Sequence, residues 1–143
     1  APQNIGQIFI VLDANFGSTF PGYNGLITSP TDDSQDFGVV GVPGYTIFGV
    51  ESNWFGYAAF NGGSTNQISN VLPTLNSRCV LMMRNTNSSA SILDDGIQLG
   101  NDRNNLSGRG WGGLMGFVVG FSSVLNSTNE NAVISYLMTQ WNV

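Results

Sequence analysis

Short runs of hydrophobic residues recur along the chain, and Gly, Asn, Pro and Ser separate them roughly every eight to twelve residues. This spacing is typical of the short antiparallel strands of a sandwich or a barrel. The runs that we expect to form strands span residues 5–13, 24–29, 36–42, 45–50, 54–61, 67–72, 78–85, 89–94, 96–101 and 114–122. Pairs such as Pro21-Gly22 and Pro43-Gly44 favour tight turns between them. The pattern therefore predicts an all-β domain.

The runs differ in how their hydrophobic positions are arranged. Residues 6–12 alternate in part, as a strand with one polar face does, whereas residues 79–83 are apolar throughout. A continuous apolar run is typical of a central strand that is covered on both faces. We therefore expect a core between two sheets, with a further element that caps the outer face of the central strand.

Only the end of the chain has a helical pattern. Residues 126–130 are typical of a helix start, and the apolar residues that follow repeat with the period of a helix. Their shared face carries Val133, Ile134, Leu137, Met138 and Trp141. We predict a helix over residues 128–141, with Ser127 or Thr128 as its N-cap and with its apolar face packed on the sandwich.

Composition and charge exclude several kinds of partner. A chain of 143 residues with 41% hydrophobic residues is long enough for one ordinary domain with its own core. It has no Lys or His, and its net charge is -5, so we expect no binding to nucleic acid. No apolar run is long enough to cross a membrane. The lone Cys79 lies in an apolar run, so we expect a small buried residue rather than a reactive thiol.

The end of the chain also carries a family resemblance. A glycine-rich segment leads into Gly116-Phe117-Val118-Val119-Gly120-Phe121, and the predicted helix ends in Tyr136-Leu137-Met138-Thr139-Gln140-Trp141. This arrangement resembles the last strand and the closing helix of concanavalin A-like, laminin G-like jelly-roll domains. Residues 7–12 and 25–29 are similar to two strands of that family, and residues 77–83, 87–93 and 96–100 are similar, in the same order, to its hairpins.

The resemblance implies that residues 1–143 form a single two-sheet antiparallel jelly-roll sandwich, of the type found in lectins and glucanases, with a short C-terminal helix. Three departures from the family pattern matter, one of which is that the Arg common in the loop after the last strand is missing. Phe117 or Val118 stands where the family has an acidic residue, and the usual first strand upstream of Ile5 is missing. We therefore expect either that the domain belongs to a longer polypeptide or that a partner supplies an edge of the sheet.

Candidate catalytic groups are few. Jelly-roll glycosidases present clustered carboxylates across a sugar cleft, but the only glutamates here, Glu51 and Glu130, lie in no such cluster. The less favoured alternative is a glycoside hydrolase, for which the least implausible pair of carboxylates is Asp36 with Glu51. Because His and Lys are also absent, most other general bases and nucleophiles are missing. We expect neither enzymatic activity nor a cofactor.

Three carboxylates, those of Asp32, Asp33 and Asp36, lie in or beside one predicted loop. Hard cations such as Ca²⁺ prefer oxygen ligands of this kind. The spacing is not that of an EF-hand, and a solvated acidic loop is the alternative interpretation. The sequence leaves both a Ca²⁺ site and a solvated loop open.

A group of aromatic and amide side chains is the candidate ligand-binding site. The rings of Trp54 and Tyr57 can stack on the apolar face of a sugar, while neighbouring polar groups bind its hydroxyls. The polar residues that we assign to this site are Asn53, Asn61, Asn101, Asp102 and Arg103. The alternative is that the rings pack in the core or between subunits and that the amides only form turns.

These observations predict a non-catalytic carbohydrate-binding or adhesion module whose partner is a glycan or a cell-surface polysaccharide. The Gly- and Asn-rich composition without Lys is similar to that of virion-surface domains, so we expect the protein on a virion or fibre surface or otherwise outside the cell. We also expect a homo-oligomer. The alternative is a structural virion, decoration or oligomerisation domain without a ligand, in which Trp54 lies at a subunit interface rather than in an open groove.

Overall fold

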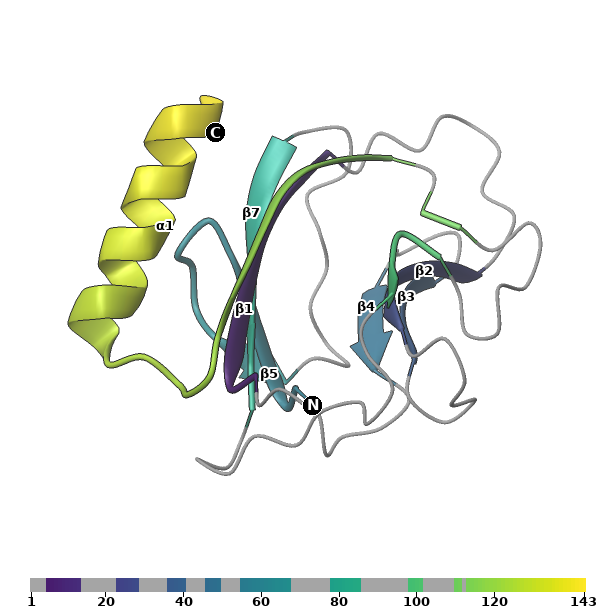
Figure 1. The fold of residues 1–143 in the computed structure, drawn as a ribbon, viewed down its shortest axis with the longest axis horizontal. Coiled ribbons are helices and arrows are strands. Elements are labelled where there is room, and N and C mark those ends of the chain that lie inside the picture. Colours follow the sequence, from purple (N-terminus) through teal and green to yellow (C-terminus); the bar gives the residue numbers. More distant parts are fainter. Residues whose placement is uncertain are drawn as a thin grey trace.

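The computed structural model describes residues 5–13, 23–28, 36–40, 46–49, 55–67, 78–85, 98–101, 110–111 and 113–143. These residues form two antiparallel sheets and one helix, stacked in three layers (Figure 1). The helix covers one face of the five-stranded sheet, and the four-stranded sheet lies against the other face. The expected combination of two antiparallel sheets with a C-terminal helix is confirmed.

The five-stranded sheet brings together strands that are far apart in the sequence. Its order is β6 (Asn66–Gln67), β5 (Tyr57–Phe60), β7 (Arg78–Arg84), β1 (Gln7–Asp13) and β9 (Leu114–Phe121). β1 is a central strand, paired along its whole length with β7 on one side and with β9 on the other. These strand pairs join segments that are far apart in the sequence. The order of the strands therefore cannot be predicted from a local sequence signal.

The four-stranded sheet has the order β4 (Thr46–Gly49), β3 (Asp36–Val40), β2 (Tyr23–Thr28) and β8 (Gln98–Leu99). Backbone hydrogen bonds tie the segment before β9 to this second sheet. Gly100 N donates to Leu26 O at 3.0 Å, and Trp111 N donates to Gly100 O at 2.9 Å. Gly110 also forms a parallel bridge with Gly25. The chain thus passes from one sheet to the other just before β9.

The core has two parts, one on each face of the five-stranded sheet. The buried residues between the sheets are Ile8, Ile10, Leu12, Leu26, Ile27, Phe55, Ala58, Cys79, Leu81 and Met83. Those beneath the helix are Phe9, Val11, Ala59, Val80, Met82, Ile134 and Leu137. Successive residues of a strand point to opposite faces, so β1 and β7 contribute to both parts. The run at 79–83 is therefore a central strand covered on both faces, as expected, and Cys79 is a buried residue within it.

Helix α1 (Ser127–Trp141) begins one residue earlier than predicted. The predicted caps, Ser127 and Thr128, are wrong, because the N-cap is Asn126. Its backbone is extended, and its side chain accepts a hydrogen bond from Asn129 N at 2.9 Å. An Asn side chain satisfies a free N–H at a helix start at least as well as Ser or Thr does. The helix is therefore capped by Asn126, the first residue of the segment 126–130 that is typical of a helix start.

The apolar face of α1 packs on the five-stranded sheet, as predicted. Ile134 and Leu137 of α1 are buried against the sheet, and the partly buried residues of the same face are Val133, Met138 and Trp141. In the part of the chain that the structure describes, no helix has the length and hydropathy needed to cross a membrane.

Several strands are shorter than predicted. β5 begins at Tyr57 rather than at residue 54, and the buried Phe55 precedes it outside the strand. β8 covers Gln98–Leu99 and ends before the predicted residue 101, because the chain turns at Gly100, whose φ of 73° favours glycine; residues 96–97 lie outside the described residues. The predicted strand at 89–94 and most of the one at 67–72 lie outside the described residues.

Candidate functional site

Strand β9 forms an edge of the five-stranded sheet. It has eight residues and pairs with β1 along one side. Among the described residues, no strand pairs with its other side. An open edge presents a row of backbone N–H and C=O groups to which another strand can bond. The β9 edge is therefore the first candidate for a contact with another chain.

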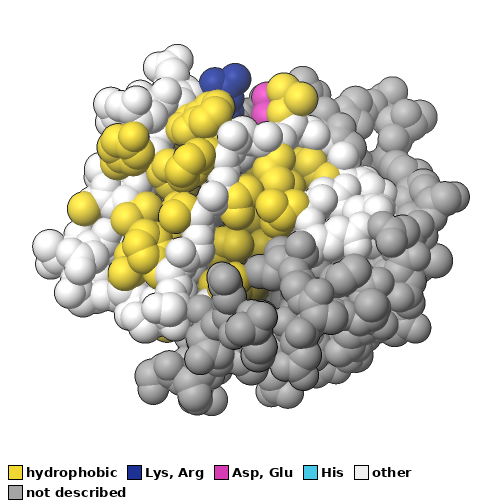
Figure 2. Space-filling model, viewed as in Figure 1, with side chains coloured by type: hydrophobic (Ala, Val, Ile, Leu, Met, Phe, Trp, Pro, Cys, Tyr) yellow, Lys and Arg dark blue, Asp and Glu magenta, His cyan; other side chains and the backbone are white. Residues whose placement is uncertain are grey.

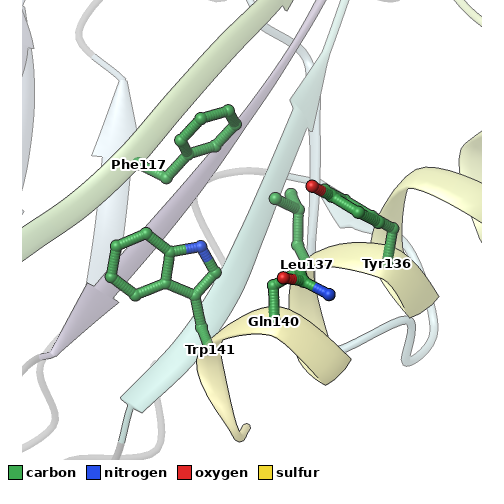
Figure 3. A pocket seen from close by; sticks show the side chains of 5 residues that line it. All are labelled: Phe117, Tyr136, Leu137, Gln140 and Trp141. Atoms are coloured by element: carbon green, nitrogen blue, oxygen red, sulfur yellow. The ribbon is translucent and has the colours of Figure 1, made fainter.

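A β-bulge decides which side chains of β9 face the helix. The register with β1 shifts at Gly116, which is the extra residue between Met115 and Phe117. As a result, Met115 packs on the core between the sheets, whereas Phe117 points toward α1 (Figure 3). A Cβ at position 116 would lie 2.7 Å from the ring of Trp141, so glycine lets the indole lie close to the strand.

A groove runs between β9 and α1. One hollow in it has a volume of about 290 Å³ and is lined by Phe117, Tyr136, Leu137, Gln140 and Trp141 (Figure 3). An adjoining hollow of about 360 Å³ is lined by Phe117, Val119, Phe121, Ala132, Val133, Tyr136 and Leu137. We call the two hollows together the β9–α1 groove. The described residues of its walls are aromatic and aliphatic apart from the amide of Gln140 and the hydroxyl of Tyr136.

Large hydrophobic side chains are exposed along this edge. Phe117 is 41% exposed, Tyr136 61% and Leu114 70%, and in the described part of the chain Leu99 is the only other large hydrophobic residue that is exposed. Figure 2 shows hydrophobic side chains gathered on the face across which β9 runs in Figure 1. Single exposed hydrophobic residues are ordinary, but a contiguous apolar surface beside an open strand marks a site of contact.

The groove carries almost no charge. Glu130 is the only charged side chain between Gly113 and Val143. Its Oε2 accepts a hydrogen bond from Nε2 of Gln7 at 2.6 Å and lies 3.5 Å from Nη1 of Arg84. Open edges are commonly guarded by charged residues or by Pro, which oppose pairing with another chain. β9 contains neither.

Hydrogen bonds at both ends hold α1 on the sheet. At the N-terminal end, the fully buried Gln7 binds Glu130 and also accepts a hydrogen bond from Leu125 N at 2.8 Å. At the C-terminal end, Nη1 of Arg78 donates to Trp141 O at 2.9 Å. The helix cannot move relative to β9 without breaking these bonds, so the fold itself sets the width of the groove.

The structure describes Tyr57, Asn61 and Asn101 of the residues predicted to bind a glycan. Tyr57 begins β5, and the guanidinium carbon of Arg84 lies 5.9 Å from the centre of its ring. Asn61 follows the other end of β5 and accepts a hydrogen bond from Val80 N at 2.8 Å, so it holds the turn after this strand. Asn101 follows β8 in the other sheet. Asn53, Trp54, Asp102 and Arg103 lie outside the described residues, and the site as a whole stays a prediction.

The predicted carboxylate sites are described only in part. Asp36 begins β3, whereas Asp32, Asp33 and Glu51 lie outside the described residues. Within the described ranges, no three His, Cys, Asp or Glu side chains gather where they could hold a metal ion. The predicted Ca²⁺ site and the pairing of Asp36 with Glu51 therefore stay untested.

Reasoning from the sequence does not identify the β9–α1 groove. Phe117 and Tyr136 lie in a predicted strand and a predicted helix, and only the strand order places them on either side of one groove. One signal is present in the sequence, because the run at 114–122 contains neither a charged residue nor Pro. Comparisons with protein families, with curated proteins and with solved structures find no match for this chain.

Proposed function

We propose that this protein is a structural, oligomer-forming domain that assembles through the β9 edge and the β9–α1 groove. The observation that carries the proposal is a strand of eight residues whose outer edge is open among the described residues, and which lies beside a groove whose described lining is apolar and uncharged. When a strand adds to such an edge, backbone hydrogen bonds supply affinity, and side chains that enter the neighbouring groove supply specificity.

Burial of the exposed aromatic residues would drive this association. Fully burying a large exposed hydrophobic side chain contributes roughly 1.5–3 kcal/mol. Phe117 is 41% exposed and Tyr136 61%, so each would contribute a part of that amount when a partner covers it. Because α1 is held at both ends, little further ordering is needed when a partner binds. Glu130 is paired within the chain, so assembly would bury no unpaired charge.

The mass of the purified chain in solution, measured by sedimentation over a range of concentrations, tests the proposal. We expect an oligomer that dissociates on dilution, and we expect Phe117→Asp to give a monomer because it places a charge in the groove. Leu99→Asp is the matched control, because Leu99 is 44% exposed but lies on β8, at the edge of the other sheet. A wild-type chain that is monomeric at every concentration contradicts the proposal, as does equal dissociation by the two variants.

Two further points concern the fold topology and the location of the protein. We propose that the two sheets are those of a concanavalin A-like jelly roll, which the position of β1 between β7 and β9 and the closing helix support. We also propose that the assembly lies on a virion or fibre surface or otherwise outside a cell, on the basis of composition alone. An experimental structure tests the first point, and antibody labelling of the source particles or cells tests the second.

A second candidate function is carbohydrate binding or adhesion, and one observation favours it. The rings of Phe117, Tyr136 and Trp141 line a hollow together with the amide of Gln140. Rings that stack on a sugar and amides that bind its hydroxyls are the groups such a ligand needs. The predicted site around Trp54 and Tyr57 belongs to the same hypothesis.

A glycan array, probed with and without Ca²⁺, tests this second candidate. Selective binding that is lost in Gln140→Ala places the sugar in the β9–α1 groove, whereas selective binding lost only in Trp54→Ala places it at the site predicted from the sequence. If the wild-type chain binds no glycan, carbohydrate binding is wrong and the assembly function is unaffected.

A further inference from the structure

We infer that the partner of β9 is the β9 strand of a second copy of this chain, paired antiparallel about a two-fold axis. The inference rests on the proposed assembly function and specifies its geometry. The two five-stranded sheets then join into one continuous sheet, with both α1 helices on the same face. Three properties of β9 lead to this arrangement.

The first property is charge. The chain has a net charge of -5, so two copies repel each other in most orientations. Between Gly113 and Val143 the only charged side chain is Glu130, which is already bound by Gln7 and Arg84. Two β9–α1 grooves can therefore meet without placing like charges opposite each other. A strongly basic or acidic partner would have no opposite charge to bind in this region. A second β9 strand is uncharged and apolar, and therefore matches this edge.

The second property is the symmetry of the β9 sequence about Val118. Glycines lie two residues to either side, at Gly116 and Gly120, and Phe117 and Val119 lie one residue to either side. Antiparallel pairing centred on Val118 places this residue opposite its own copy. It also places Phe117 opposite the partner's Val119, which is a favourable pair of an aromatic and a β-branched residue.

The third property is that residues paired across the joint lie on the same face of the joined sheet. Phe117 and Val119 both line the β9–α1 groove, so each pair that they form across the joint lies on the helix face. Val118 packs against the core between the sheets, so the central pair extends that core across the axis. The inferred pairing thus covers the exposed Phe117 and continues both hydrophobic layers from one copy to the next.

Cysteine cross-linking tests this register. In Val118→Cys the two thiols face each other at the Cβ separation of an antiparallel pair, about 4.5–5.5 Å, and mild oxidation should link most chains into covalent dimers. Val119→Cys and Leu99→Cys are the controls, because position 119 faces the partner's Phe117 and Leu99 lies on the other sheet. Both should stay largely unlinked. The native Cys79 is buried and does not compete.

The outcomes separate this inference from the proposed function. If Phe117→Asp dissociates the oligomer but Val118→Cys does not link, the assembly surface stands and the two-fold strand pairing is wrong. If Val119→Cys links more completely than Val118→Cys, the register is wrong. A wild-type chain that never associates overturns both the inference and the proposed function.

Amide hydrogen exchange of the unmodified chain gives a second readout that needs no variant. The N–H groups of residues 116–120 that point away from β1 should exchange more slowly as the concentration rises through the range in which the dimer forms. The amides of β8 should not change. Protection of β9 that stays constant while the mass doubles overturns the strand pairing.

Discussion

Gln7 is a fully buried polar residue, and both the nitrogen and the oxygen of its side-chain amide form hydrogen bonds. Its Nε2 donates to Glu130 at 2.6 Å, and its Oε1 accepts from Leu125 N at 2.8 Å. A buried polar group is tolerated when it is paired, and removing one partner leaves the other buried without a hydrogen bond. Gln7 therefore couples the folding of β1 to the docking of α1, which forms one wall of the groove.

We predict that Gln7→Leu lowers the free energy of unfolding by about 1–3 kcal/mol, because Leu125 N and the Glu130 carboxylate lose a buried partner. Urea unfolding followed by circular dichroism measures this change. Gln140→Leu makes the same substitution at an exposed position of α1 and should change the free energy by less than about 0.5 kcal/mol. Equal stability of Gln7→Leu and the wild type would show that the two hydrogen bonds contribute nothing.

The thiol of Cys79 is held in its protonated form. Burial, followed by the negative charge of Asp13, raises its pKa from 9.0 to about 12. Because the folded-state pKa is raised, the contribution of this thiol to stability is fully present below the unfolded pKa of 9.0. It is lost as the pH rises from 9.0 toward about 12, where the unfolded chain ionises first.

We predict that the free energy of unfolding falls above pH 9.0 and that Cys79→Ala reduces this fall. Urea unfolding at a series of pH values measures both chains. The same burial predicts that a disulfide reagent labels Cys79 at about pH 8 only after unfolding, since the thiolate is the reactive species. Rapid labelling of the folded chain would show that the thiol is more accessible than its burial implies.

At the scale of the element, helix α1 shows how the cap sets a boundary. The side chain of Asn126 bonds Asn129 N, whereas Ser127 is already the first residue of the helix. We predict that Asn126→Ala lowers the free energy of unfolding by about 1 kcal/mol. Ser127→Ala, the loss of the cap that the sequence favours, should change it by less than about 0.5 kcal/mol. Thermal unfolding of the two variants gives the ranking, and the reverse order would place the cap at Ser127.

The elements that the sequence predicts well are those whose signals are local. The apolar run at 79–83 and the helical repeat at 133–141 each carry the burial pattern of one element, and both form as expected. Strand ends are less local, because β5 and β8 end where their neighbours stop pairing. The boundaries of these strands therefore differ from the predicted ones, and the predicted strand at 89–94 lies outside the described residues.

The candidate site depends on information that no single element carries. Among the described residues, β9 is an edge because it pairs with β1 on one side and with no strand on the other, and this follows from contacts between residues that are far apart in the sequence. The hydrophobic periodicity of each element alone therefore does not predict that Phe117 and Tyr136 line the same groove. What the sequence does show is the lack of charge and Pro in the run at 114–122, which gains its meaning once the strand is known to be an edge.

At the scale of the whole molecule, the distribution of charge distinguishes two kinds of assembly. An interface held by ion pairs weakens as salt screens the attraction between opposite charges. None of the described residues that line the β9–α1 groove is charged, while the chain as a whole carries a net charge of -5. Salt should therefore act mainly on the repulsion between two acidic copies, and it should leave the apolar contact intact.

We predict that the dimer association constant rises by a factor of a few as NaCl is increased from low ionic strength to about 0.5 M, where charges more than a few ångströms apart are screened. Sedimentation at a series of salt concentrations measures this constant. Phe117→Asp should stay monomeric throughout, because its added charge lies inside the groove, where it would be buried without a partner. A dimer that dissociates as salt is added would mean that ion pairs hold the copies together, and the contact would then have to lie on a charged face away from β9.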